Sequence, residues 1–398
     1  MAGQEDPPPR AARKPVAGIK DVARVAGVSV GTVSNVLNYP EKVSDNTRTR
    51  VEAVIARIGF VRNSAAAGMR RGRSQLIGLV VPDVTNPFFA EVAKGAVDTA
   101  FAAGYVVVLC NSDGDPAREA RYLAVLEEQR VAGVLLNPVG KVPHTAIDSL
   151  RVRSSSIVFI DRAVPRNDAC SVSVNDVLGG YEAVLHLLEL GARRIALING
   201  PTSLRQCLDR RRGAERAIKE FAASGATLIQ EASQNMSVAG GHDAAARLLS
   251  RSESVDGVFC TNDLMAIGAS RAFGGIARIP EDVLMVGYDD IPLALEQQTP
   301  LTSVSQPKFE LGKAGCELLL REIEAEDEHK HVRLAFEPTM MIRGSTERAQ
   351  QAVGDLRTAG GPPDEVKTAS RGVRPAKQFS PDRESSAKGV QATPDPSD

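Results

Sequence analysis

Residues 18–62 contain three short helical patterns of apolar and polar side chains. The first covers about residues 20–26, the second covers residues 30–37, and the third starts at Ser44. A tight turn, Gly27 to Ser29, separates the first two, and Ser is a favourable N-cap for the helix that follows. Apolar residues of the three patterns share one predicted core: Val22, Val25, Val33, Val36, Leu37, Val51, Val54, Ile55 and Ile58. Three helices around one core, with a turn of this kind, predict a helix-turn-helix unit.

Residues 75–346 alternate short, continuously apolar runs with helical patterns, such as 88–103 and 177–190. Continuous apolar strands separated by helices are typical of parallel sheets that are covered on both faces. Nine strand candidates are too many for one simple sheet, so we expect two Rossmann-like halves that divide near residues 161–175. The candidates are 76–81, 105–110, 133–136, 157–160, 172–174, 195–198, 228–229, 257–260 and 283–287. Ligands of such sheets bind at the carboxyl ends of the strands, so the cleft between the halves is the expected effector site.

Composition divides the rest of the chain. Residues 1–17 and 347–398 are rich in Pro, Gly, Ser and charge, and we interpret them as a disordered N-terminal extension and a disordered C-terminal tail. A short Ala/Arg segment, residues 63–74, joins the helical unit of 18–62 to the region 75–346. The predicted fold is therefore an α-helical helix-turn-helix domain followed by an α/β core of two Rossmann-like subdomains.

Charge is distributed unevenly along the chain. Residues 1–74 carry 13 Lys and Arg against 6 Asp and Glu, a net charge of +7, which leaves −8 on the remainder of a chain with a total of −1. A basic domain on an acidic body is typical of a protein that binds a polyanion at one end. The five cysteines are scattered and form no CxxC, and the first residues lack the apolar core of a signal peptide. We therefore expect a reduced, cytoplasmic protein with no membrane segment.

The second helix of the basic domain is the candidate DNA-reading helix. Its N-terminal side chains would meet base edges in the major groove, and Asn35 can pair with adenine while Val30 can contact a thymine methyl group. A non-binding three-helix bundle is the alternative interpretation. The predicted DNA-binding set from this domain consists of Ser29, Val30, Gly31 and Asn35, with phosphate contacts from Thr32, Ser34, Asn38, Lys42, Ser44, Thr47 and Arg48.

A family resemblance supports this interpretation. The segment from Gly18 to Asn38, GIKDVARVAGVSVGTVSNVLN, resembles the DNA-binding domain of the lac-repressor and purine-repressor family, and so does the following VSDNTR. Within the core, the resembling stretches are 77–89, 159–162, 261–263 and 286–292. The resemblance covers roughly residues 18–346 and implies a homodimeric repressor that binds palindromic double-stranded operator DNA and senses a small molecule, a sugar or a nucleobase, in a periplasmic-binding-protein-like core.

The resemblance also assigns roles in the linker and marks two departures. It implies that residues 63–69 form a hinge helix in which Met69 wedges into the minor groove; a flexible linker whose arginines touch phosphates is the alternative. Asn35 stands where many members carry Arg, so the half-site bases cannot be transferred. Leu208 stands where many members carry an effector-side Arg, so the effector class stays open.

Four residues are predicted to contact the effector, because each follows a predicted strand and the matching positions of the family contact effectors. They are Asn86, Phe88, Arg162 and Asp263. Arg and Asp suit hydroxyl-rich ligands as charge-assisted donors and acceptors. Capping of the helices that follow is the alternative role for this group, and a structural role is expected for the Asp289-Asp290 pair.

Two other function classes are less well supported. A solute-binding protein with the same core fold would need an export signal and no basic domain. An α/β hydrolase would need a strand before the GxSxG match at 27–31, where a helical pattern stands instead. His329 and His331 are interpreted as solvated surface rather than metal ligands, and no Walker A, GxGxxG or HExxH motif occurs, so we expect no catalytic residues, no cofactor and no metal.

Overall fold

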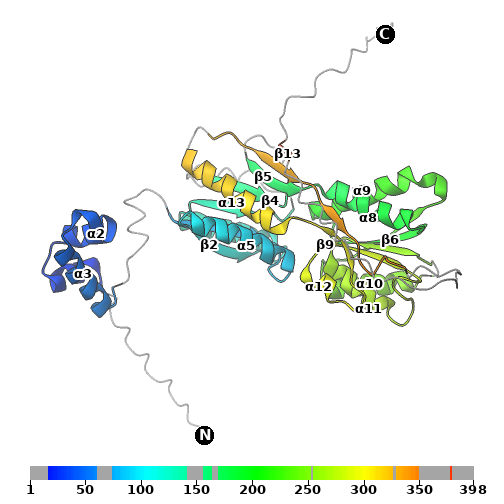
Figure 1. Ribbon diagram of the computed structural model, residues 1–398, viewed down its shortest axis with the longest axis horizontal. Helices are drawn as coiled ribbons and strands as arrows, with labels where there is room; N and C mark the ends of the chain where they lie inside the picture. Colours follow the sequence, from blue (N-terminus) through cyan, green and yellow to red (C-terminus); the bar gives the residue numbers. More distant parts are fainter. Residues whose placement is uncertain are drawn as a thin grey trace, which may run out of the picture. The chain divides into compact units, whose positions relative to one another are not determined.

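The structure, a computed structural model, describes residues 17–60, 74–140, 156–163, 169–251, 254–325, 329–348 and 377–378. The chain divides into two compact units, Met1–Ser74 and Gln75–Asp398, which we call the head and the core (Figure 1). Met69 and most of the predicted hinge lie outside the described residues, as do residues 1–16 and most of 347–398. Among the described helices, none is both long enough and apolar enough to cross a membrane.

The head contains the expected three helices, with a short 3-10 turn between the last two. They are α1 (Ile19–Ala26), α2 (Val30–Asn38), η1 (Pro40–Lys42) and α3 (Asp45–Ile58). α1 ends at Gly27, whose φ of 64° lies in the left-handed region that glycine adopts without strain. The buried core consists of Val22, Ala23, Ala26, Val33, Val36, Val51 and Val54. Val25 was expected in this core, and that expectation is wrong, because its side chain is 39% exposed.

The first sheet of the core has seven strands in the order β13-β11-β5-β4-β3-β1-β2. β2 and β13 are its edges, and the five inner strands run parallel. Its strands are β1 (Leu76–Val81), β2 (Val106–Asn111), β3 (Gly133–Leu136), β4 (Ser156–Ile160), β5 (Cys170–Val174), β11 (Arg333–Phe336) and β13 (Lys377–Gln378). The helices of this half are α5 (Pro87–Ala102), α6 (Pro116–Glu128) and α13 (Lys308–Ala325).

The second sheet has six strands in the order β12-β10-β9-β8-β6-β7. In Figure 1, α8 and α9 lie on one side of this sheet and α10 and α11 on the other. Its strands are β6 (Arg194–Asn199), β7 (Thr227–Ala232), β8 (Gly257–Cys260), β9 (Leu284–Asp289), β10 (Thr302–Ser305) and β12 (Thr339–Met341). Its helices are α8 (Asp176–Glu189), α9 (Arg205–Glu220), η2 (Ala222–Ser224), α10 (Val238–Leu249), α11 (Asp263–Phe273) and α12 (Pro292–Leu295).

The chain passes between the two halves of the core four times. It leaves the first sheet after β5, returns through α13 to form β11, crosses again to form β12, and returns to add β13 beside β11. The sequence predicted the two halves and the region of the first crossing, but β10, β11 and β12 were not among the nine strand candidates. Their sequences, TSVS, RLAF and TMM, mix polar with apolar residues, so no continuous apolar run marks them.

The returning helix α13 lies against α5 at a very short distance (Figure 1). A Cβ atom at Gly312 would lie 1.9 Å from the Val92 carbonyl oxygen, and one at Gly95 would lie 2.1 Å from the Phe309 carbonyl oxygen. Any larger residue at either position would push the two helices apart. The two glycines thus fix α13 closely onto the first half of the core.

Candidate functional site

The first candidate site is the exposed face of α2 in the head. Ser29 caps this helix, because its hydroxyl accepts a hydrogen bond of 3.0 Å from the Thr32 backbone N–H. Val33 and Val36 point into the core and fix the rotation of the helix. The opposite face carries the predicted base-reading residues Val30, Gly31 and Asn35, all exposed. The GxSxG match thus covers the turn after α1 and the first residues of α2, in a helix-turn-helix rather than a nucleophile elbow.

Further predicted DNA-binding residues surround this face. The Asn38 side-chain amide donates to the Ser34 carbonyl oxygen at 2.8 Å, so Asn38 stays close to the helix axis. Lys42 lies over the Tyr39 ring, with its Nζ 4.4 Å from the ring centroid. Ser44 is the N-cap residue of α3, and its hydroxyl donates to the Thr47 hydroxyl at 3.0 Å rather than accepting from a backbone N–H.

The second candidate site is a group of buried polar side chains in the core, which we call the polar cluster: Asp161, Asp176, Arg210, Asp289 and Gln306. Arg210 lies at its centre and is 2% exposed. Its Nε donates to Asp176 Oδ1 at 2.8 Å and its Nη1 donates to the Thr261 carbonyl oxygen at 2.6 Å. The guanidinium also lies 3.5 Å from Asp289 Oδ1 and stacks on the Tyr288 ring at 3.6 Å.

The electrostatics of this cluster follow from burial and from its surplus of carboxylates. Burial alone would lower the pKa of Arg210, but Asp176 and Asp289 raise it well above its usual value. Burial raises the pKa of Asp161 well above its usual value, and the nearby charges of Asp176 and Asp289 add to the effect. Arg210 therefore stays charged, whereas Asp161 is driven toward its neutral form.

The polar cluster joins the two halves of the core at the carboxyl ends of their strands. Asp161 follows β4 of the first sheet, while Asp289 ends β9 of the second sheet. Gln306, in the segment that crosses back to the first half, donates to Asp289 Oδ1 at 2.7 Å. Lys308, the first residue of α13, donates to the Asp289 carbonyl oxygen at 2.8 Å. Closure of one half on the other would therefore act directly on these side chains.

Strained backbone marks the same strand ends. Asp161, Asp289 and Asp290 have φ angles of 54°, 98° and 53°. Non-glycine residues with positive φ are uncommon and cluster at functional sites, where the surrounding structure holds them. Asp290 is held by Arg343, whose Nη2 donates to its Oδ1 at 2.5 Å. Within the described residues, Asp161 Oδ1, Asn199 Oδ1 and Gln306 Oε1 are buried without a hydrogen-bond partner. A polar ligand bound here could supply the missing hydrogen bonds.

The structure places two of the predicted effector residues at the N-terminus of α5. Asn86 is its N-cap, accepting from the Phe88 N–H at 3.0 Å, and its side chain also hydrogen-bonds Asp289. Burial raises the pKa of Asp289, and the hydrogen bond from Asn86 opposes part of that rise. Asn86 therefore adjoins the polar cluster. Phe88 is 2% exposed and contacts Phe89 edge to face, with ring centroids 5.0 Å apart, within the apolar core.

The other two predicted effector residues lie in different environments. Arg162 is partly buried beside Asp161, and its Nη1 donates a hydrogen bond of 3.4 Å to the Pro138 carbonyl oxygen. Asp263 is fully buried, where it accepts from the Ser303 hydroxyl at 2.7 Å and from the Ile291 N–H at 2.9 Å. Burial and the charge of Asp289 raise the pKa of Asp263 to about 8. Contact of any of the four with an effector stays a prediction.

Arg210, Asp161 and Asp176 were not among the predicted site residues. The family resemblance places an effector-side arginine at position 208, which is Leu here, whereas the buried arginine stands two residues later on α9. The sequence did contain a signal for a buried arginine. Three consecutive arginines, 210–212, lie in one helix, and consecutive residues of a helix point in different directions, so only one of the three could face the core. The interpretation of His329 as solvated surface is wrong, because its side chain is only 10% exposed and contacts Cys170.

Comparisons with known proteins match both the head and the core. The description "Bacterial regulatory proteins, lacI family" matches residues 18–63, and "Periplasmic binding protein-like domain" matches residues 184–346. The ribose operon repressor of Escherichia coli (strain K12) is 34% identical over 335 residues, which is 83% of this chain and all of that protein.

Solved structures show the same similarity. The transcriptional regulator CelR in complex with cellobiose is 31% identical, with a TM-score of 0.61, over 83% of this chain and 99% of that one. The lac repressor dimer bound to operator and the anti-inducer ONPF is 25% identical, with a TM-score of 0.72, over 83% and 99% of the two chains.

Proposed function

Because the chain belongs to the lacI family of bacterial regulatory proteins, we propose that it is an effector-responsive transcriptional repressor and not an enzyme. The observation that carries the proposal is the capped helix α2, which buries Val33 and Val36 and presents Val30, Gly31 and Asn35 to solvent. A helix with that geometry fits the major groove of duplex DNA. The proposed place of action is the cytoplasm, where operator DNA lies.

The proposed domain division assigns one task to each part of the chain. Residues 18–62 bind DNA, 63–74 form the hinge, with Met69 as the minor-groove wedge, and 75–346 bind the effector and dimerise. Residues 1–17 and 347–398 are terminal extensions. In α2, Val30 and Asn35 read bases, and the neighbouring polar residues position the head on phosphates. Lys42 and Arg48 supply positive charge beside this face.

Dimerisation is proposed to use the exposed apolar face of the first half of the core. Five large apolar side chains on α5 and the edge strand β2 are exposed there: Val97, Phe101, Val106, Val108 and Leu109. Phe101 is 79% exposed. Several exposed apolar side chains on two elements in contact with each other support an interaction site there. A second copy of the chain would cover it and supply the second head that a palindromic operator requires.

The effector is proposed to bind at the polar cluster and to be a sugar or another small, hydroxyl-rich molecule, with a nucleobase as the alternative. The support is chemical, because a buried guanidinium, several carboxylates and buried polar atoms without a partner suit a ligand with many hydroxyl groups. We propose that Asn86, Phe88, Arg162 and Asp263 belong to this site together with Asp161, Arg210 and Asp289. Effector binding would shift the population between two arrangements of the halves and so change operator affinity.

The experiment that tests the repressor function is selection of duplexes from a randomised library by the full chain, followed by anisotropy titrations on the selected site. We expect a palindrome and an affinity that falls steeply with salt. Lys42→Ala should weaken binding to all sequences and reduce the slope of log K against log salt by about 1, whereas Asn35→Ala should relax the preference for one base by about 1–3 kcal/mol.

Lys219→Ala is the matched control, because Lys219 is also an exposed lysine, on α9 of the core. It should leave both the affinity and the salt slope unchanged. If the full chain selected no duplex at low ionic strength, the proposed function would be refuted.

A further inference from the structure

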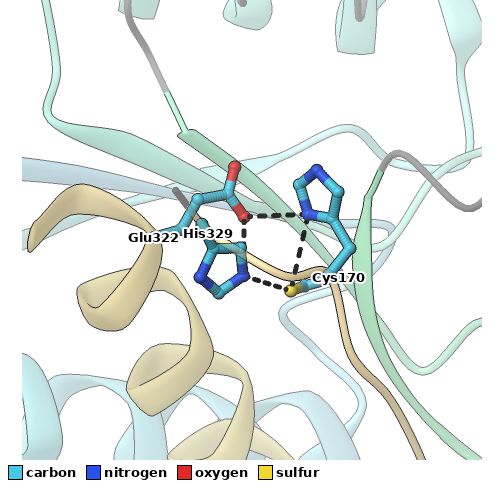
Figure 2. A group of neighbouring side chains, drawn as sticks. Cys170, Glu322 and His329 are labelled. Atoms are coloured by element: carbon cyan, nitrogen blue, oxygen red, sulfur yellow. Dashed lines mark hydrogen bonds and ion pairs between the residues drawn. The ribbon is translucent and has the colours of Figure 1, made fainter. Parts of the chain in front are cut away.

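Four side chains with metal-ligating atoms converge in the first half of the core, far apart in the sequence. Cys170 is the first residue of β5, Glu322 lies in the last turns of α13, and His329 and His331 lie in the segment before β11. Figure 2 shows Cys170, Glu322 and His329 pointing toward one another. Among the described residues, this is the one group of such side chains whose ligand atoms all lie within 4.8 Å of one another.

The distances between these atoms approach those of a tetrahedral metal site. Cys170 Sγ lies 3.0 Å from His329 Nε2 and 3.8 Å from His331 Nδ1. Glu322 Oε2 lies 4.0 Å from His329 Nε2 and 3.8 Å from His331 Nδ1. With zinc bonds of about 2.3 Å to sulfur and about 2.0–2.1 Å to nitrogen and oxygen, tetrahedral ligand atoms are roughly 3.3–3.6 Å apart. Shifts of less than about 1 Å would bring all four atoms onto one ion.

The surroundings of the four side chains also favour metal binding. The Val332 backbone N–H donates to Cys170 Sγ at 3.3 Å, an outer-shell contact typical of metal-bound thiolates. Cys170 is fully buried and the Glu322 side chain is 11% exposed, so the site is shielded from solvent on those sides.

We propose that Cys170, Glu322, His329 and His331 form a structural site for a zinc-class divalent metal ion. One thiolate, two imidazoles and one carboxylate complete a four-coordinate shell of the type that zinc prefers, and with all four positions filled by protein the ion has a structural rather than a catalytic role. Binding releases the Cys170 thiol proton to solvent. The ion would join the end of α13 to the start of β5 and to the segment that leads into β11.

The position of this metal site separates it from the polar cluster. β1, β3, β4, β5 and β11 run parallel, so the start of β5 lies at the edge of the sheet opposite to the strand ends that carry Asp161. The start of β1, where the core begins, lies at the same edge as the metal site. Metal binding therefore leaves the effector site open and strengthens the edge at which the segment from the head enters the core.

The test uses the reduced full chain after treatment with a chelator. Titration with Zn²⁺ against a chromophoric competitor should show one tight site per chain, and Zn²⁺ should raise the melting temperature. Co²⁺ in its place should give a sulfur-to-metal charge-transfer band and the intense visible bands of a tetrahedral site. Cys170→Ser should remove the charge-transfer band. His331→Ala should weaken binding by at least the roughly 10–100-fold that loss of an outer-shell partner costs.

Two matched controls separate this site from adventitious binding. Cys110→Ser removes another buried thiol and His242→Ala removes an exposed histidine on α10, and both should bind one Zn²⁺ as the natural chain does. If Cys170→Ser does not fold, His331→Ala decides, because that side chain is 26% exposed and tolerates truncation. Absence of a stoichiometric site in the natural chain, or unchanged affinity in His331→Ala, would overturn the proposal.

Discussion

Replacement of Arg210 by Met should destabilise the core strongly and through electrostatics rather than through lost volume. The substitution keeps an unbranched apolar stem over the Tyr288 ring, but it removes the cation that pairs with Asp176 at 2.8 Å and lies 3.5 Å from Asp289. Removing one partner of a buried ion pair leaves an uncompensated buried charge and costs about 3–5 kcal/mol. We expect a loss of that size in the free energy of unfolding.

The assay is urea unfolding of the full chain without effector, followed by far-ultraviolet circular dichroism. The double variant Arg210→Met with Asp176→Asn should be more stable than the sum of the two single changes predicts, because the second change removes one of the stranded charges. Arg216→Met is the matched control, since Arg216 lies on the same helix and pairs with Glu220 at 2.9 Å at the exposed surface. It should leave the unfolding midpoint unchanged. If Arg210→Met shifted the midpoint no more than Arg216→Met, the polar cluster would not be the coupled electrostatic unit described above.

Two further predictions concern pH dependence and assembly. The pKa of Asp263 is about 8 in the folded chain against 3.8 without burial, so its contribution to stability is present below about pH 4 and is lost as the pH rises toward 8. Over this range the free energy of unfolding of the natural chain should therefore fall more steeply than that of Asp263→Asn, by at most about 1.4 kcal/mol per pH unit. Parallel pH profiles of the two chains would contradict this. Phe101→Glu should convert the dimer to a monomer in light scattering after size exclusion, whereas Leu190→Glu, at a 40% exposed apolar position on the second half, should not; dimers in both variants would exclude the proposed face.

The sequence predicted the architecture because the apolar pattern is strong where it is local. The continuous runs at β1, β3 and β6 have almost no other reading than buried parallel strands. The head was likewise predictable, since Gly27, Ser29 and the spacing of the buried valines are all short-range signals. Val25 was misplaced because a helix of eight residues offers too few positions to define the rotation of its apolar face.

The candidate sites of the core were less predictable, because their chemistry depends on contacts between distant segments. Arg210 meets Asp176 34 residues away and Asp289 79 residues away, and no local pattern distinguishes it from the exposed Arg212. Cys170 and His329 are 159 residues apart. Their proximity follows only from the parallel pairing of β5 with β11, a strand of four residues that the apolar pattern did not reveal.

The repeated passages of the chain between the halves of the core set an order for its synthesis. The head is complete once residue 60 has left the ribosome, whereas the first half of the core needs β11, whose last residue is Phe336. During translation the DNA-binding unit can therefore fold long before the part that is proposed to sense the effector and form the dimer. A chain whose synthesis stopped in between would carry a folded head without the proposed effector-binding and dimerisation core. Degradation of such incomplete chains would therefore be needed to keep DNA binding by the head under the control of the effector.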